Sequence, residues 1–156
     1  LNNCQSCPSG YSSPAASIDI SSCIDINECQ TNNGGCSSNA KCTNTIGSRT
    51  CSCNSGYSGD GLTCSPNPCQ PDSGFPLTQS GQTSTINNCP VNQYGNSTRS
   101  CSLGIWSSIT NNCQNCPPGY SSPVNSVDIS SCVDIDECLT NNGGCSLNAK
   151  CTNTIG

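Results

Sequence analysis

Two carboxylates, Asp25 and Glu28, stand three residues apart directly before Cys29. The same arrangement returns at residues 134–138. Calcium takes about six to eight oxygen ligands from carboxylates, amide side chains and backbone carbonyls, and a cysteine that follows the acids can pin them in place. The pattern therefore predicts a calcium site at this segment. The alternative is a pair of solvated acids on a loop.

The other reactive residues form no catalytic pattern. The chain has no histidine, so serine and cysteine lack the base that activates a nucleophile. A glycosidase-like pair of carboxylates needs a cleft, which small modules do not form. The spacing Cys4-x-x-Cys7 occurs in redox and thiolate metal sites, but neither a histidine nor a βαβ pattern supports such a site. We expect no enzyme activity in this stretch.

Cysteine content determines the expected fold class. Cysteine makes up 18 of the 156 residues, or about 12%, above the level of about 8–10% that marks a disulfide scaffold. Serine, asparagine and threonine make up another 62 residues, about 40%. We therefore predict small disulfide-rich all-β modules in tandem, with no large hydrophobic core. Disulfides at this density persist in oxidising compartments, which predicts an extracellular or cell-surface location reached by the secretory pathway.

Charge and hydropathy exclude two classes of partner. The formal net charge is -5, and the only cations are Lys41, Arg49, Arg99 and Lys150, so nucleic acid is a poor partner. No run approaches 18 apolar residues, so no direct membrane insertion is expected. The first residues show no signal segment. We expect mature sequence cut from a longer chain.

The two ends of the sequence are near copies. Residues 1–47 align with residues 110–156 without a gap, at an offset of 109, and 37 of the 47 positions are identical. This predicts a tandem repeat with a period of 109 residues. The expected modules are a Cys-rich mini-module at 1–24 that follows the end of an upstream module at Cys4, a six-cysteine module at 25–64, a linker at 65–68, a four-cysteine module at 69–113, a second mini-module at 114–133 and a truncated six-cysteine module at 134–156. Short strands are expected at 40–45, 49–52 and 96–102.

The six-cysteine module resembles a calcium-binding EGF-like domain. The residues that carry the resemblance are Asp25-Ile26-Asn27-Glu28-Cys29, Asn32-Asn33-Gly34-Gly35-Cys36, Cys42-Thr43-Asn44-Thr45, Cys51-Ser52-Cys53, Gly56-Tyr57 and Cys64. The match covers residues 25–64 and restarts at 134–156. The resemblance implies the disulfides Cys29–Cys42, Cys36–Cys51 and Cys53–Cys64. It leaves Tyr57 with two roles, packing at a module junction or covering the last disulfide.

The resemblance also implies a calcium ligand set. In the first copy the ligands are the side chains of Asp25, Glu28 and Asn44 and the carbonyls of Ile26, Thr45 and Ser48. In the second copy they are Asp134, Ile135, Glu137, Asn153 and Thr154, and the counterpart of Ser48 lies beyond Gly156. The implied Cys29–Cys42 bridge brings the acidic segment to Asn44. Extracellular modules bind calcium with dissociation constants of about 10⁻⁴–10⁻³ M.

The four-cysteine module resembles a sushi, or complement-control, module, although it is short. The resemblance rests on Cys69, Cys89, Cys101 and Cys113 around Tyr94-Gly95 and Gly104-Ile105-Trp106. It implies the disulfides Cys69–Cys101 and Cys89–Cys113, with Trp106 filling the core between them. The alternative is an unrelated two-disulfide sandwich. The mini-module, Cys4-x-x-Cys7-Pro8 with Cys23, resembles small Cys-rich modules of growth-factor and ephrin receptor ectodomains.

Counting assigns the remaining cysteines. If Cys113 closes the sushi-like module, Cys116 pairs with Cys132, and by repetition Cys7 pairs with Cys23. Cys138 and Cys151 are the counterparts of Cys29 and Cys42. The partners of the last two cysteines, Cys4 and Cys145, fall outside the sequence, so no free thiol is needed.

The leading functional hypothesis is structural. Near-identical tandem modules build quasi-one-dimensional arrays, and calcium beside the Cys23–Asp25 junction would stiffen them. We expect a calcium-stiffened extracellular rod, or the subunit of a surface filament or fibril, with further copies of the repeat as partners. The alternative is a receptor or adhesion ectodomain that binds an extracellular protein ligand. Glycans are expected as well, because Asn96-Ser97-Thr98 is an N-glycosylation sequon.

Overall fold

The computed structural model describes residues 6–17 and 19–156. They fall into two compact units, Leu1–Asn67 and Pro68–Gly156. The strands are short and antiparallel, and the helices of the described residues are single 3₁₀ turns. The predicted class of small disulfide-rich all-β modules is confirmed. Within the described ranges, no helix has the length and apolarity needed to cross a membrane.

The first unit contains three short antiparallel strand pairs. Its elements are β1 (Tyr11–Ser12), η1 (Ile20–Ser22), β2 (Ile24–Asp25), η2 (Glu28–Gln30), η3 (Asn32–Gly35), β3 (Ala40–Thr45), β4 (Ser48–Cys53), β5 (Tyr57–Gly59) and β6 (Cys64–Pro66). The pairs are β1 with β2, β3 with β4, and β5 with β6.

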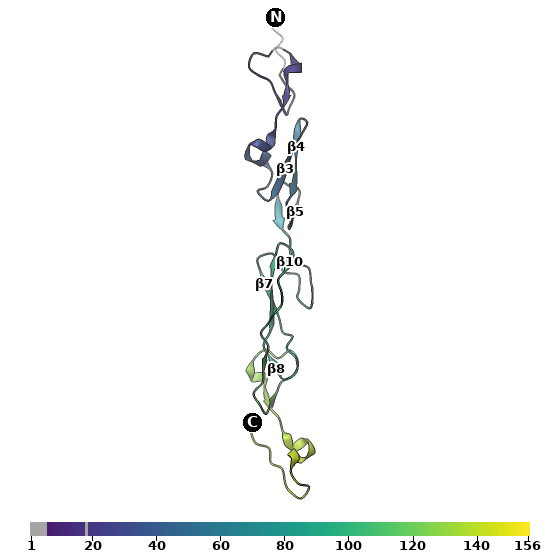
Figure 1. The fold of residues 1–156 in the computed structure, drawn as a ribbon, viewed down its shortest axis with the longest axis vertical. Coiled ribbons are helices and arrows are strands. Elements are labelled where there is room, and N and C mark those ends of the chain that lie inside the picture. The colour runs from purple at the N-terminus through teal and green to yellow at the C-terminus, as the bar shows by residue number, and fades with distance from the viewer. Residues whose placement is uncertain (1–5, 18) are drawn as a thin grey trace. The chain divides into compact units, whose positions relative to one another are not determined.

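The β3–β4 hairpin is the longest of these pairs (Figure 1). Along β3, buried or half-buried Ala40, Cys42 and Asn44 alternate with exposed residues, which is the two-residue period of a strand with one covered face. The turn after Thr45 contains Gly47 at φ 72°, a conformation that glycine adopts without steric cost. The predicted strand at 40–45 is confirmed, and β4 is one residue longer at each end than predicted.

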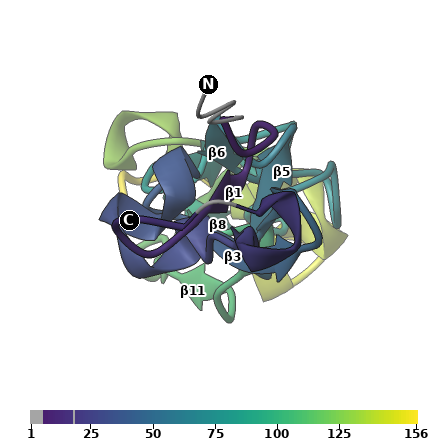
Figure 2. The same cartoon turned by 90° about the horizontal axis from the view of Figure 1, so that it is seen from above.

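The core of the first unit is small. Cys36, Ala40 and Cys64 are buried, and Tyr57 packs against this cluster. Tyr57 also lies opposite Pro66 in the β5–β6 pair. Both strands are labelled in Figure 2. Tyr57 therefore covers its own module, and β6 includes the first two residues of the expected linker.

The second unit has a four-stranded sheet with three partners of β9. Its elements are β7 (Thr83–Ile86), β8 (Gln93–Tyr94), β9 (Ser97–Ser102), β10 (Ile105–Trp106), β11 (Thr110–Asn111), β12 (Gln114–Asn115), β13 (Tyr120–Ser121), η4 (Ile129–Ser131), β14 (Val133–Asp134), η5 (Glu137–Leu139) and η6 (Asn141–Gly144). Strand β9 pairs with β7, β10 and β11, while β8 pairs with β12 and β13 with β14.

Phe75, rather than Trp106, occupies the core of the 69–113 module. The Phe75 side chain is 1% exposed, whereas Trp106 is half-buried and its indole nitrogen donates to the Gln70 carbonyl at 2.8 Å. The two ring centroids lie 5.7 Å apart. The expectation that Trp106 fills the core is therefore wrong: its polar N–H needs a partner, and the purely apolar ring takes the dry position.

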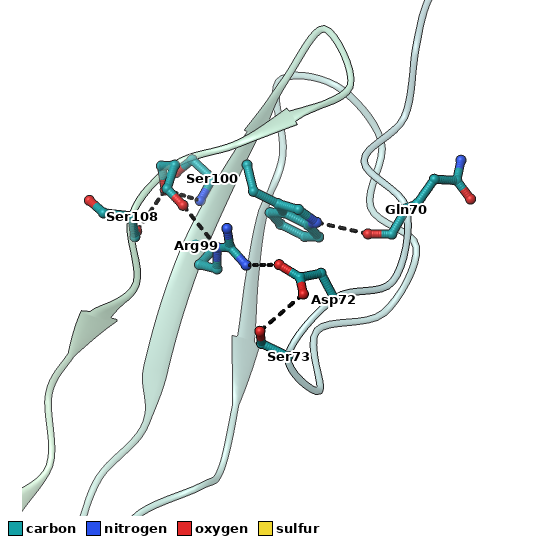
Figure 3. Close-up of polar contacts among 8 residues, drawn as sticks. Gln70, Asp72, Ser73, Arg99, Ser100 and Ser108 are labelled. Carbon is teal, nitrogen blue, oxygen red and sulfur yellow. Dashed lines mark hydrogen bonds and ion pairs between the residues drawn. The ribbon is translucent and has the colours of Figure 1, made fainter.

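Arg99 lies over both rings and is hydrogen-bonded to Asp72, in the loop that precedes Phe75. Its guanidinium carbon is 5.7 Å from the Phe75 centroid and 5.2 Å from that of Trp106. It also donates to the Asp72 carboxylate at 2.6 Å, and Ser73 donates to the other oxygen (Figure 3). The Arg99 hydrogen bond, followed by that of Ser73, lowers the pKa of Asp72 below the ordinary aspartate value.

Eight disulfides cross-link the two units internally. The structure joins Cys7–Cys23, Cys29–Cys42, Cys36–Cys51, Cys53–Cys64, Cys69–Cys101, Cys89–Cys113, Cys116–Cys132 and Cys138–Cys151. These are the eight pairs expected from the sequence. Cys145 is exposed and forms no disulfide among the described residues; it is the counterpart of Cys36, whose partner Cys51 has no counterpart in the sequence given. Cys4 lies outside the described residues.

Removing the Phe75 ring should destabilise the second unit. Truncation of a buried phenylalanine costs about 3–5 kcal/mol, so Phe75→Ala should lower the free energy of unfolding by about that amount, and Phe75→Leu by less. Guanidinium unfolding of the oxidised chain can be followed by the fluorescence of Trp106, the single tryptophan. The control is Ile105→Ala at a side chain that is 72% exposed. An equal effect of Phe75→Ala and the control would contradict the assignment of the core.

The Asp72–Arg99 pair predicts a pH dependence. Because the folded-state pKa of Asp72 is lowered, the stability it contributes is present above the ordinary aspartate pKa and is lost as the pH falls through the folded value. A carboxyl NMR titration should place Asp72 below the ordinary value, and Arg99→Gln should raise its pKa. Asp60, whose pKa is lowered chiefly by the Thr63 N–H, should not move. A midpoint for Asp72 that is unchanged in Arg99→Gln would refute this cause.

Candidate metal centre

The acidic segment is held by backbone pairing on one side and a helix cap on the other. Asp25 belongs to β2, and Glu28 begins η2. Between them, the Asn27 side chain accepts a hydrogen bond from the Cys29 N–H at 3.1 Å, the usual role of asparagine at a helix N-cap. Asn27 therefore caps the turn, and the two carboxylates that flank it are left for other partners.

The Cys29–Cys42 disulfide brings the acidic segment against the hairpin. Asn44, two residues beyond Cys42, donates from Nδ2 to Asp25 Oδ2 at 2.8 Å. The Gly47 backbone N–H donates to Asp25 Oδ1 at 2.5 Å. Asp25 is thus bonded to the hairpin strand and to its turn. The structure brings the predicted side chains of Asp25 and Asn44 together.

Two of the predicted ligand oxygens are buried without a hydrogen bond. Glu28 Oε2 and Asn44 Oδ1 have no hydrogen-bond partner among the described residues. Leaving a buried acceptor unsatisfied costs about 1–3 kcal/mol, and more for a charged group. A cation bound by both oxygens would remove this cost, and carboxylate and amide oxygens are ligands that fit a calcium ion.

The residues whose carbonyls the resemblance implies as ligands lie close in sequence to Asp25 and Asn44. Thr45 and Ser48 face each other as the last pair of the β3–β4 hairpin, and Ile26 directly follows β2. Within residues 6–17 and 19–156, no group of three or more His, Cys, Asp or Glu side chains could hold a metal. The candidate centre has two carboxylates, so an amide and backbone oxygens must complete it.

The second copy repeats the arrangement. Asn153 Nδ2 donates to Asp134 Oδ2 at 2.8 Å, and the Gly156 N–H donates to Asp134 Oδ1 at 2.8 Å. Glu137 and Asn153 are exposed, whereas their counterparts in the first copy are half-buried. The sequence given ends at Gly156, so it includes no counterpart of β4 to cover them.

The mini-module contacts the turn that donates to Asp25. Tyr11 in β1 pairs with Asp25 in β2, and the Ile26 N–H donates to the Gly10 carbonyl at 2.9 Å. The Tyr11 ring lies against Gly47, and a Cβ on Gly10 would collide with the Gly47 carbonyl. Backbones can approach this closely only where glycine lacks a side chain.

Sequence reasoning missed this contact, although a signal was present. Gly10-Tyr11 and Gly47 recur as Gly119-Tyr120 and Gly156. In the second copy, Gly119 again approaches Gly156, and the Ile135 N–H donates to the Gly119 carbonyl at 2.8 Å.

Comparison with known families identifies the two EGF modules. Residues 29–64 match the family model of the EGF domain, and residues 134–156 match that of the calcium-binding EGF domain. The chain contains EGF domains. The EGF resemblance is thereby confirmed over these residues.

Two curated relatives are similar over most of the chain. Human (Homo sapiens) fibulin-2 is 34% identical over 131 residues, which cover 74% of this chain and 10% of fibulin-2. Mouse (Mus musculus) nidogen-2 is 33% identical over 150 residues, which cover 92% of this chain and 9% of nidogen-2. The chain thus spans about a tenth of the length of these relatives. Together with the EGF domains, they confirm that the protein is extracellular, secreted or in the matrix.

Neutralising Asp25 should loosen the hairpin turn even without metal. In Asp25→Asn, an amide group replaces one acceptor oxygen and faces the donor of either Asn44 or Gly47. Hydrogen bonds to charged groups contribute about 1.5–3 kcal/mol, so the Gly47 amide should exchange at least about tenfold faster in chelator. Hydrogen exchange by NMR gives the measurement.

Asp60→Asn is the matched control, because Asp60 accepts from Leu62 and Thr63 within its own turn. It should leave Gly47 exchange unchanged. Equal Gly47 exchange in Asp25→Asn and the unaltered chain would contradict the role assigned to Asp25.

Proposed function

We propose that calcium binds at the start of each EGF domain and fixes its joint with the preceding mini-module. In the first copy, Asp25, Glu28 and Asn44 would hold the ion by side chains, and Ile26, Thr45 and Ser48 by backbone carbonyls. In the second copy the corresponding residues are Asp134, Ile135, Glu137, Asn153 and Thr154. The observation that carries the proposal is the pair of buried oxygens, Glu28 Oε2 and Asn44 Oδ1, without hydrogen bonds among the described residues.

Charge supports the same proposal. Arg99–Asp72 is the only ion pair among the described residues, so neither Asp25 nor Glu28 has a cationic side chain at salt-bridge distance. The two carboxylates are three residues apart in the sequence, and a nearby positive charge favours the ionised form of both. A bound calcium ion would supply that positive charge, and oxygen ligands are those it prefers.

The close similarity of the two copies extends the calcium-binding family match to the first EGF domain. Residues 25–47 and 134–156 differ at only three of 23 positions, 27, 30 and 38 in the first copy. None of these is a proposed ligand, and the hydrogen bonds of Asp25 and Asp134 have the same partners. We therefore assign calcium to both copies.

Asp25 links ion binding to the joint between modules. Its side chain accepts from the hairpin while its backbone pairs with Tyr11. An ion held at Asp25 would restrain both the hairpin and the mini-module through one residue. Repeated every 109 residues, this joint would give a semi-rigid extracellular rod or a filament subunit, with further copies of the repeat as partners. The similarity to fibulin-2 and nidogen-2 supports a matrix role.

Two smaller assignments belong to the same proposal. We assign residues 69–113 to a sushi-like module, because their disulfides join the first cysteine to the third and the second to the fourth. We also assign an N-linked glycan to Asn96. Its side chain is partly exposed, and its Oδ1 accepts from Asn112 at 3.3 Å, which leaves Nδ2 as the atom for attachment.

Calorimetric titration tests calcium binding directly. The oxidised chain should bind calcium with a dissociation constant of about 10⁻⁴–10⁻³ M. The double variants Glu28→Gln with Glu137→Gln and Asn44→Ala with Asn153→Ala should each weaken binding at least about tenfold, because each removes a ligand from both sites. Asp19→Asn is the control, since Asp19 caps η1 through the Ser21 N–H.

The rod itself requires a second observation. Negative-stain microscopy of the longer native material should show extended particles in calcium and more bent ones in chelator. Absence of calorimetric binding at millimolar calcium would refute the calcium site. Collapsed particles in both conditions, despite measured binding, would refute the rod alone.

A further inference from the structure

The second mini-module docks on the preceding module through its backbone. Ser122 is 3% exposed and Ser126 is 8% exposed, and both are covered in this contact. The hydrogen bonds run from Asn92 N to Ser122 O at 3.0 Å, from Asn125 N to Cys89 O at 2.7 Å, from Gly95 N to Ser126 O at 2.9 Å and from Ser122 Oγ to Gln93 O at 2.9 Å. We call residues 122–126 the docking face and residues 89–95 its receiving segment.

The first mini-module carries the same face in the same conformation. Residues 13–17 are the counterpart of the docking face at the 109-residue offset. Ala16 and Asn125 both have φ 65°. Ser17 Oγ donates to Pro14 O at 2.8 Å, as Ser126 Oγ does to Pro123 O at 2.8 Å.

The face at 13–17 differs in being open. Ser13 is exposed, whereas Ser122 is buried. From the described residues, no hydrogen bond reaches the Ala16 N–H, the Ser13 carbonyl or the Ser17 carbonyl. Their counterparts in the second copy are each bonded to the receiving segment.

The positive φ of Ala16 is not one that alanine prefers. Residues with a Cβ pay about 1–2 kcal/mol in the left-handed region, and asparagine is tolerated there better than alanine. Residues held this way persist where the surrounding structure determines them, often at binding surfaces. The turn at 13–17 is therefore preformed, with its backbone donor and acceptors directed outward.

The differences between the copies are compatible with one binding mode. Positions 15 and 16 are alanines in the first copy and Val124 and Asn125 in the second. Val124 is 62% exposed, and Asn125 contacts the receiving segment by its backbone N–H. The docking contact uses main-chain groups and a serine hydroxyl, both of which are kept at residues 13–17.

We propose that residues 13–17 dock a second copy of the 69–113 module, one in which residues 1–4 stand for residues 110–113, through its segment corresponding to residues 89–95. The Ala16 N–H would donate to the Cys89 carbonyl of that copy, and the Ser13 and Ser17 carbonyls would accept from its Asn92 and Gly95. The proposal rests on the tandem-repeat part of the proposed function but not on calcium. It gives each mini-module two fixed sides, one at the EGF domain and one at the module before it.

An extended chain tests the proposal. Residues 68–109 are placed directly before Leu1, so that Leu1 takes the position that Thr110 has in the repeat. Amide hydrogen exchange is measured by NMR in chelator, which makes the result independent of the metal site. The Ala16 amide should exchange at least about tenfold more slowly than in the unextended chain, approaching the rate of Asn125. Equal Ala16 exchange in the two chains would overturn the proposal.

Matched serine variants separate docking from a general change in folding. In the unextended chain, Ser122→Asp should speed exchange at Asn125, because it buries a charge, and Ser13→Asp should leave the Ile26 amide unchanged. In the extended chain, Ser13→Asp should return Ala16 to fast exchange while Ile26 stays protected. Continued protection of Ala16 in that variant would overturn the assignment of this face.

Discussion

The Cys29–Cys42 disulfide holds the acidic segment against the hairpin, and the candidate metal centre depends on this constraint. A bridge that closes a loop of this size contributes about 3 kcal/mol by restricting the unfolded chain. Residue 28 directly precedes one bridged cysteine and residue 44 lies two positions after the other, so the bridge limits how far apart they can move. Among the described residues of the first unit, Cys36, Ala40 and Cys64 are the only buried apolar ones, so covalent cross-links must replace the packing that positions ligands in larger domains.

Asp25 converts this local constraint into a connection between modules. Its side chain is fixed by Asn44 and Gly47, and its backbone is paired with Tyr11. On the far side, the second mini-module is joined to the preceding module by backbone hydrogen bonds around Asn92 and Ser122. A chain that repeats both contacts would have no freely jointed position next to its mini-modules, which is the physical basis for a rod.

The sequence was sufficient for features that depend on spacing. The EGF and sushi resemblances and the count of the remaining cysteines led to the eight pairs found in the structure. The EGF resemblance also pointed to Asp25 and Asn44, which lie in contact. It was insufficient where three-dimensional packing decides. The sushi resemblance implied that Trp106 fills the core, but its N–H requires a partner and Phe75 takes the buried position. Tyr11 and Gly47 are 36 positions apart, and they meet because β1 pairs with β2 while the Gly47 N–H donates to Asp25 in β2. The only signal for this contact in the sequence is that Gly10-Tyr11 and Gly47 recur together in the second copy.

Residual dipolar couplings would test the central claim, that calcium fixes the joint between the mini-module and the EGF domain. Couplings are measured for residues 6–17 and 19–23 and for residues 28–64, with calcium and with chelator. The account predicts that one alignment tensor fits both groups in calcium, and that in chelator the couplings of the mini-module become smaller and need a separate tensor. A single common tensor in both conditions, at calcium concentrations where binding is measured, would contradict it.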